Sequence, residues 1–325
     1  MKISFIKKYS FLVGFFLLIF VIYRLDLEAF FLALKKINYS LLILAMLLTL
    51  PIILCKAWRW NYLKKNQGIN YKLSGSFLMY GVSMAIGLLT PGRIGEVSKI
   101  AYLKNDGCST GQSLVSVVMD RLLDLLFLMF FGYLGIIFFF GFFEKITLIY
   151  SIIIFSIIGL VFIIKKRLYY KLIKKIFSII IPQKYQKLWR IHFRDFFNGI
   201  KSYSKKNYFY CFLITLFSWL IYYLQIYLFA KSIWLIKIPF IYLAIAVTVS
   251  GFITLLPVSF LGIGTRETTL ILLLSPLAIN PERIILLSEL ILLDFLVIGI
   301  IGAISWIFKP LPLAQIFSTK TTIKS

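Results

Sequence analysis

Long apolar runs alternate with short basic segments along the whole chain. Six of these runs are long enough, or nearly so, to cross a bilayer, which takes roughly 20 residues of helix: they cover residues 11–23, 41–58, 113–140, 146–164, 208–230 and 284–308. The pattern predicts an all-α integral membrane protein, a polytopic helical bundle that forms one domain over residues 1–325.

Two further apolar runs are interrupted. The first, at 77–103, breaks at Pro91-Gly92, and the second, at 240–274, breaks at Pro257 and the glycines that follow it. They are predicted to be re-entrant helical hairpins that enter from opposite sides, although short crossing helices would instead give eight spans. Matching broken helices in two halves are typical of an inverted transporter repeat. Because Pro-Gly breaks are common in membrane helices, a chance similarity is the alternative.

Composition supports a membrane protein. Hydrophobic residues make up 61% of the chain and charged residues 15%, a balance that a soluble domain of this size could not keep off its surface. The formal net charge is +24, but the basic residues flank apolar runs, so we expect contact with anionic lipid and not with nucleic acid. Their distribution predicts the inner (cytoplasmic) membrane, with both termini cytoplasmic.

The segment 165–206 is the longest polar stretch and carries many basic residues with a single acid, Asp195. Leu168, Leu172 and Ile176 recur at helical spacing opposite a lysine-rich face. This pattern predicts a basic amphipathic cytoplasmic loop whose helix lies in an anionic interface. A solvated basic loop is the alternative.

Metal and cofactor chemistry has little support in the sequence. Cys55, Cys108 and Cys211 are isolated, and His192 is the only histidine. Since thiolate and imidazole metal sites need these residues at close spacing, we expect no metal and no cofactor.

Several charged residues fall inside apolar runs, where each must be paired or face a polar cavity. Asp120 and Asp124 lie at positions i and i+4 on one helical face, with Arg121 turned aside. Two carboxylates on one face require a cation, and Arg93 or Arg266 is the predicted partner. The alternative is a buried ion-pair lock that only holds helices together.

Each chain break is followed by an arginine and a glutamate: Arg93 and Glu96 after the first, Arg266 and Glu267 after the second. Helix starts favour anions, arginine donates two hydrogen bonds to phosphate, and glycine admits a close backbone approach. The sequence therefore predicts a lipid-phosphate site, with the glutamates as arginine partners, caps or proton carriers. Loops that only satisfy their own backbone are the alternative.

Asp294, near the middle of the last run, is a further candidate for the same site.

Three motifs, Thr90-Pro-Gly-Arg-Ile-Gly-Glu, Val118-Met-Asp-Arg-Leu-Leu-Asp and Leu261-Gly-Ile-Gly-Thr-Arg-Glu, occur in this order. Together they resemble the flippase-like family that includes the membrane half of lysylphosphatidylglycerol synthase. The resemblance implies a membrane domain that handles lipids. It implies functional positions at Pro91, Gly92, Arg93, Gly95 and Glu96, at Asp120, Arg121 and Asp124, and at Gly264, Arg266 and Glu267.

In the synthase, aminoacyl transfer belongs to a separate soluble domain. Only residues 310–325 follow the last predicted span, so we expect no such domain here and carry over no transferase activity.

The leading interpretation is binding and translocation of an anionic or polyprenyl-phosphate-linked lipid. One alternative is an enzyme acting on a lipid-linked substrate, with Glu96, Asp120 or Asp124 as base or Mg²⁺ ligand. Another is a membrane scaffold that anchors a partner through 165–206. The sequence predicts no particular protein partner or oligomeric state. A shared cavity for Arg93 and Arg266 would favour translocation.

Overall fold

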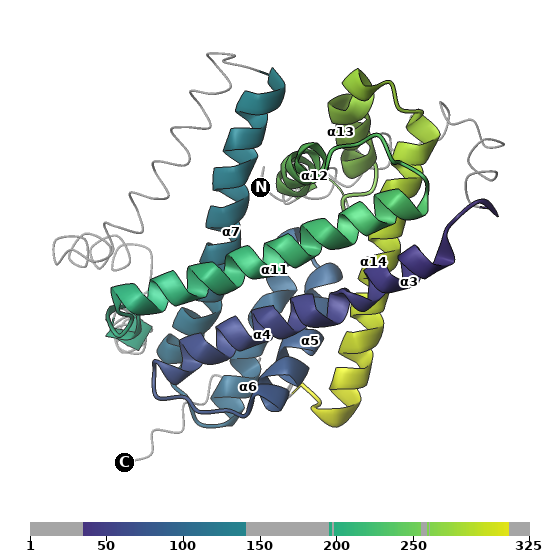
Figure 1. Cartoon of the computed structure of the whole chain (residues 1–325). Helices are drawn as coiled ribbons and strands as arrows, with labels where there is room; N and C mark the ends of the chain where they lie inside the picture. The colour runs from purple at the N-terminus through teal and green to yellow at the C-terminus, as the bar shows by residue number, and fades with distance from the viewer. Residues whose placement is uncertain (1–34, 141–194, 197, 255–258, 260, 312–325) are drawn as a thin grey trace, which may run out of the picture.

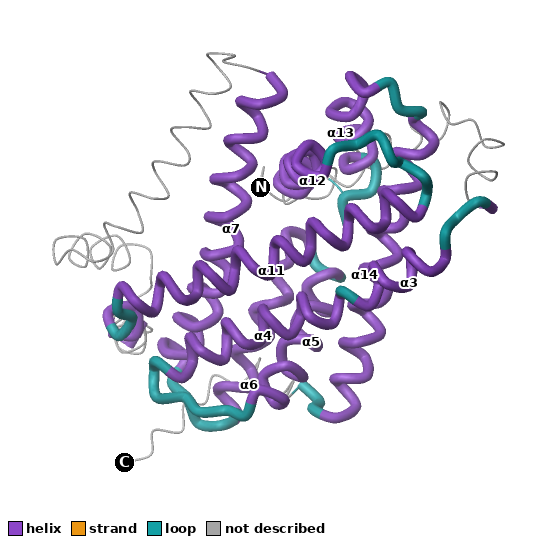
Figure 2. Tube along the Cα trace, viewed as in Figure 1, coloured by secondary structure: helices purple, strands orange, loops and turns teal. Residues whose placement is uncertain are grey.

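The computed structural model describes residues 35–140, 195–196, 198–254, 259 and 261–311. Within them every regular element is a helix (Figure 2). In chain order these are α3 (Tyr39–Leu47), α4 (Thr49–Lys65), α5 (Leu73–Leu88), the 3₁₀ helix η1 (Pro91–Ser98), α6 (Lys99–Asn105), α7 (Thr110–Phe140), α11 (Lys205–Ser232), α12 (Phe240–Thr254), α13 (Thr265–Leu274), the 3₁₀ helix η2 (Ser275–Leu277) and α14 (Pro281–Phe308).

Four described helical stretches are long and apolar enough to cross a membrane: Tyr39–Lys65, Thr110–Phe139, Lys205–Ser232 and Pro281–Phe308. They confirm that the runs predicted at 41–58, 113–140, 208–230 and 284–308 are helical and of sufficient length. The spans predicted at 11–23 and 146–164, and most of the predicted loop 165–206, lie outside the described residues. The broken runs form the shorter apolar helices α5 and α12.

Helices α3 and α4 run antiparallel to α11 along its whole length, which Figure 1 shows as two adjacent diagonals. At one end the Asn38 N–H donates to the Ser232 carbonyl at 2.8 Å. At the other end the Asn207 amide donates to the Asn66 side chain. These two polar contacts fix the register of the pair, and the apolar residues between them pack along its length.

The two short helices pack on long helices from the other half of the chain. Helix α5 lies against α14, and α12 lies against α7. Both contacts are close because a glycine meets the partner helix: an added Cβ on Gly302 would lie 2.2 Å from the Ala85 Cβ, and one on Gly135 would lie 2.7 Å from Ile245 Cγ2. Small residues admit such close helix packing in membranes. The predicted repeat of two halves stays a prediction.

The described core contains three apolar clusters, two of them large. One apolar cluster joins α11 to α14 around Phe229, Leu274 and Leu287, and another joins α4, α5 and α6 around Trp60, Met79 and Leu103. The charged and polar side chains of the candidate site lie between these clusters.

Candidate functional site between the two chain breaks

The first break is made by proline sterics. A residue before proline is disfavoured in the helical region, and Thr90 is extended (φ −123°, ψ 138°), so α5 ends at Leu88. The Thr90 hydroxyl donates to the Gly87 carbonyl at 3.0 Å and accepts from the Gly95 N–H at 2.7 Å. These bonds satisfy backbone groups freed by the break, and they hold η1 against the end of α5.

Two residues of this turn have conformations or contacts that few side chains tolerate. Arg93 has a φ of +57°, a left-handed conformation that is strained for a residue with a Cβ. Gly95 packs directly on α5, where an added Cβ would lie 2.5 Å from the Ile86 carbonyl oxygen. The turn thus fixes the position of Arg93 at a cost in backbone energy.

The second break ends with glycines and a helix cap. Gly262 (φ +79°) and Gly264 (φ +82°) turn the chain, and the Gly264 N–H donates to Glu267 Oε2 at 2.6 Å, which caps α13. Glu267 Oε1 pairs with Arg266 at 3.1 Å. Ser288 of α14 accepts from Arg266 Nε and donates to Glu267, both at 2.5 Å. The predicted roles of Glu267 as cap and arginine partner are both confirmed.

The two acidic residues of α7 share one cation, Arg59 of α4. Its Nε donates to Asp120 at 2.9 Å, and its two terminal nitrogens donate to the two oxygens of Asp124 at 3.0 and 2.9 Å. The prediction that Arg93 or Arg266 would serve these carboxylates is therefore wrong. Arg59 stands between Trp58 and Trp60 at the basic end of an apolar run, a combination typical of a membrane interface, yet its side chain is fully buried.

Two lysines complete this network. Lys99 donates to Asp120 at 2.8 Å, and Lys56 donates to Asp124 at 3.3 Å. The Tyr80 hydroxyl also donates to Asp120, at 3.0 Å. Each carboxylate thus has two cationic partners, which is the arrangement that buried carboxylates require.

Glu96 of η1 forms an ion pair with Arg121 of α7 and lies 3.9 Å from Lys99. The prediction that Glu96 pairs with the arginine of its own break, Arg93, is therefore wrong, because the arginine that reaches it comes from α7. The pair joins the first break to α7.

Asp294 of α14 differs from the two aspartates of α7 in that its hydrogen-bond partners are neutral. Its Oδ1 accepts from the Thr49 hydroxyl and from Gln225 Nε2, the latter at 3.0 Å. No described cation lies within ion-pairing distance of it. Thr49 is on α4 and Gln225 is on α11, so these bonds join α14 to the α4–α11 pair. Arg59 of α4, which also donates to Thr215 of α11, joins the same pair to α7.

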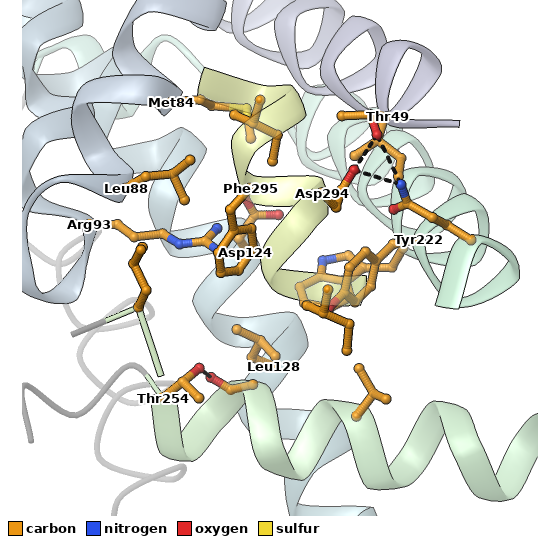
Figure 3. A pocket seen from close by; sticks show the side chains of 18 of the residues that line it. Thr49, Met84, Leu88, Arg93, Asp124, Leu128, Tyr222, Thr254, Asp294 and Phe295 are labelled. Atoms are coloured by element: carbon orange, nitrogen blue, oxygen red, sulfur yellow. Dashed lines mark hydrogen bonds between the residues drawn. The ribbon is translucent and has the colours of Figure 1, made fainter. Parts of the chain in front are cut away.

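A cavity of about 250 Å³ lies between these groups (Figure 3). The guanidinium carbons of Arg93 and Arg266 lie 5.4 and 5.8 Å from the centre of the Phe295 ring, so both breaks deliver an arginine to one aromatic side chain. The charged residues that line the cavity are Lys56, Arg93, Arg121, Asp124, Arg266 and Asp294.

Arg93 differs from the other cations of the cavity. Lys56, Arg121 and Arg266 each have a carboxylate partner, whereas no described carboxylate lies within ion-pairing distance of Arg93. Its side chain is half-buried and extends toward Phe295 in Figure 3. A guanidinium without an ion-pair partner favours an anionic ligand.

The predicted site residues therefore fall into three groups. Arg93, Arg121, Asp124, Arg266 and Asp294 line the cavity. Glu96, Asp120 and Glu267 do not line it, and pair with the basic residues around it. Four residues shape the backbone of the breaks, and these are Pro91, Gly92, Gly95 and Gly264.

Sequence reasoning missed several residues of the site. Lys56 and Arg59 face the α7 carboxylates, and Trp219, Tyr222, Gln225 and Phe295 line the cavity. Lys56 and Arg59 are three residues apart at the end of an apolar run. That spacing places both on one helical face, as the four-residue spacing does for Asp120 and Asp124, and it is the signal that could have identified them.

Helix composition, the broken segments and the buried charges define a multi-pass helical membrane protein with a cationic internal cavity. The chain belongs to the lysylphosphatidylglycerol synthase TM region family, whose model matches residues 9–312. Neither a curated protein nor a solved structure matches it. The family is named for an enzyme of lipid modification, which links this membrane protein to lipid chemistry.

Proposed function

We propose that this protein binds the phosphate of an anionic phospholipid or a polyprenyl-phosphate-linked lipid in the cavity and carries that lipid between the leaflets. On this proposal it resides in the inner (cytoplasmic) membrane with both termini on the cytoplasmic side, as the basic flanks of the spans predict.

The observation that carries the proposal is the convergence of Arg93 and Arg266 on Phe295. The two arginines come from separate breaks and line one cavity. Arg266 is neutralised by Glu267, whereas Arg93 has no described carboxylate partner. A phosphate would supply the missing negative charge and would accept bidentate hydrogen bonds from a guanidinium.

The size of the cavity limits what it can hold. Pockets for drug-sized ligands measure roughly 300–1,000 Å³, and this one measures about 250 Å³. It has room for a headgroup but not for acyl or prenyl chains. The tails would remain in the surrounding lipid while the headgroup crosses.

The carboxylates have separate roles in this proposal. Glu96 and Glu267 hold Arg121 and Arg266 in place, and Asp124 is the counter-charge of Arg59 and Lys56. Asp294, which accepts only from neutral donors, is the counter-charge or proton carrier that faces Arg93 across the cavity lining.

The test is leaflet exchange of labelled phosphatidylglycerol and polyprenyl phosphate in proteoliposomes. Native protein is compared with Arg93→Ala, Glu96→Gln and Arg266→Ala. Arg283→Ala is the control, because Arg283 is exposed and lies outside the cavity lining. We expect exchange to fall about tenfold or more in these three variants, because Arg93 and Arg266 line the cavity and Glu96 holds Arg121 in its wall, and to persist in the control. Equal exchange by native protein and Arg93→Ala would overturn the proposal.

The enzyme alternative has less support. An Mg²⁺ ion needs free carboxylate oxygens, but those of Asp120 and Asp124 already accept from Arg59, Lys56, Lys99 and Tyr80. The scaffold alternative depends on 165–206, most of which lies outside the described residues, and it stays a prediction.

A further inference from the structure

Three polar atoms in the cavity wall have neither a hydrogen-bond nor an ion-pair partner among the described residues: the indole nitrogen of Trp219, the side-chain oxygen of Gln225 and the hydroxyl of Ser250. All three come from α11 and α12, whereas the arginines come from the breaks. Gln225 is fully buried and Ser250 is 2% exposed. Since buried polar atoms in native proteins are nearly always paired, these three indicate polar atoms of a ligand.

The orientation of the Gln225 amide is fixed by its neighbours. Its nitrogen carries two hydrogens and has three acceptors within hydrogen-bonding distance: the Ala45 carbonyl at 3.1 Å, the Thr49 hydroxyl at 2.9 Å and Asp294 at 3.0 Å. A flipped amide would place its oxygen against a carbonyl and a carboxylate, which are both acceptors. The unpaired atom is therefore an oxygen, and it can only accept a hydrogen bond.

Trp219 supplies the opposite kind of group, because an indole nitrogen can only donate. Its ring stacks on Phe127 with centroids 4.9 Å apart and an interplanar angle of 13°, and Tyr222 meets it edge-on at 5.5 Å. These contacts hold the donor in one place before any ligand arrives, which limits the entropy lost on binding.

Ser250 adds a hydroxyl that is not used by its own helix. Other buried hydroxyls here bond to a carbonyl one turn back: Ser218 donates to Thr215 at 2.9 Å and Ser232 donates to Phe229 at 2.7 Å. Ser250 makes no such bond within the described residues. It can therefore donate to a ligand or accept from one.

The donor and acceptor types select one kind of headgroup. An ammonium only donates and would be repelled by Arg93, and a bare phosphate only accepts and would leave Gln225 unpaired. A hydroxyl does both. We propose that this site, taken as the lipid site proposed above, selects headgroups that carry hydroxyls next to the phosphate, as glycerol and sugar or cyclitol headgroups do.

The experiment compares two lipids of equal charge. Phosphatidylglycerol and phosphatidylpropanol are both monoanionic phosphodiesters with a three-carbon headgroup, and only the first carries hydroxyls. Purified protein is mixed with equal amounts of the two lipids, distinguished by isotopically labelled acyl chains, and the retained lipid is quantified by mass spectrometry. Phosphatidylinositol forms a second arm, and phosphatidylcholine sets the background.

We expect native protein to prefer phosphatidylglycerol by about tenfold, since each unpaired buried group weakens binding. Trp219→Phe and Ser250→Ala should each lower this ratio toward one. Trp58→Phe and Ser232→Ala, which change residues outside the cavity lining, should leave it unchanged. If phosphatidylinositol is retained more than phosphatidylglycerol, the selected headgroup is a ring polyol; the reverse order assigns it to glycerol.

Equal retention of phosphatidylglycerol and phosphatidylpropanol by native protein would overturn the inference, whatever the variants do. If that equal retention still depends on Arg93, the proposed phosphate site stands and only the hydroxyl selection fails. If neither lipid exceeds phosphatidylcholine, both proposals fail together. A preference that survives in both Trp219→Phe and Ser250→Ala would also contradict the assignment to these residues.

Discussion

Arg59 and Asp124 form a bidentate ion pair between α4 and α7, with two nitrogen–oxygen distances of 3.0 and 2.9 Å. The guanidinium also donates to Asp120 and Thr215, so its donors are directed at fixed acceptors from α7 and α11. The buried Arg59 side chain therefore joins α4, α7 and α11 at one point.

Removing Arg59 should strongly destabilise the protein. We expect Arg59→Met to lower the free energy of unfolding by about 3 kcal/mol or more, because it leaves two buried carboxylates with one lysine each. Thermal unfolding in detergent micelles measures the change. Arg283→Met is the control, since Arg283 is exposed and makes a single bond to the Trp234 carbonyl. Equal loss of stability in the two variants would contradict the role of Arg59.

The two cavity carboxylates should respond differently to neutralisation. Asp124→Asn removes a charge that two cations share, and we expect it to cost about 2–4 kcal/mol. Asp294→Asn keeps an oxygen for Thr49 and Gln225 and unbalances no paired cation, so we expect a change of about 1 kcal/mol or less. Denaturant titration of both variants in the same micelles makes the comparison. A larger loss for Asp294→Asn would show that it has a cationic partner.

Arg93 allows stability and function to be separated. Its φ of +57° is strained for any residue with a Cβ. We expect Arg93→Gly to be more stable than Arg93→Ala by about 1 kcal/mol, because glycine adopts this conformation readily. Both variants lose the guanidinium, so both should fail to exchange lipid. Unfolding midpoints and leaflet exchange are measured on the same preparations, and equal stability would show that the turn is not strained.

The contact between α5 and α14 depends on one glycine. An added Cβ on Gly302 would overlap Ala85, whereas one on Gly299 would have no atom within 4 Å. We expect Gly302→Ala to destabilise the protein by about 1–3 kcal/mol. The matched variant Gly299→Ala should be neutral or slightly stabilising, because alanine is the better helix former. If both variants unfold at the same temperature, α5 and α14 do not pack this closely.

The sequence predicted the parts of the fold that local chemistry decides. The end of α5 follows from the steric conflict between Thr90 and Pro91, and the cap of α13 follows from Gly264 and Glu267. The four described spans follow from hydrophobicity over lengths that match a bilayer.

Parts of the site that depend on tertiary packing could not be predicted in the same way. Arg59 lies beside Trp58 and Trp60, a combination that is typical of a membrane interface. Only the packing of α4 against α5 and α7 shows that Arg59 and Trp60 are buried while Trp58 is 45% exposed. Likewise, Gln225 lies in an apolar run that gives no sign of which face meets the cavity.

Each short helix packs on a long helix from the other half of the chain, and this limits how the protein can be divided. A half-length chain would leave α5 or α12 without the long helix that covers it, since α14 and α7 belong to the other half. Two separate halves would therefore have to meet in the bilayer before either became stable.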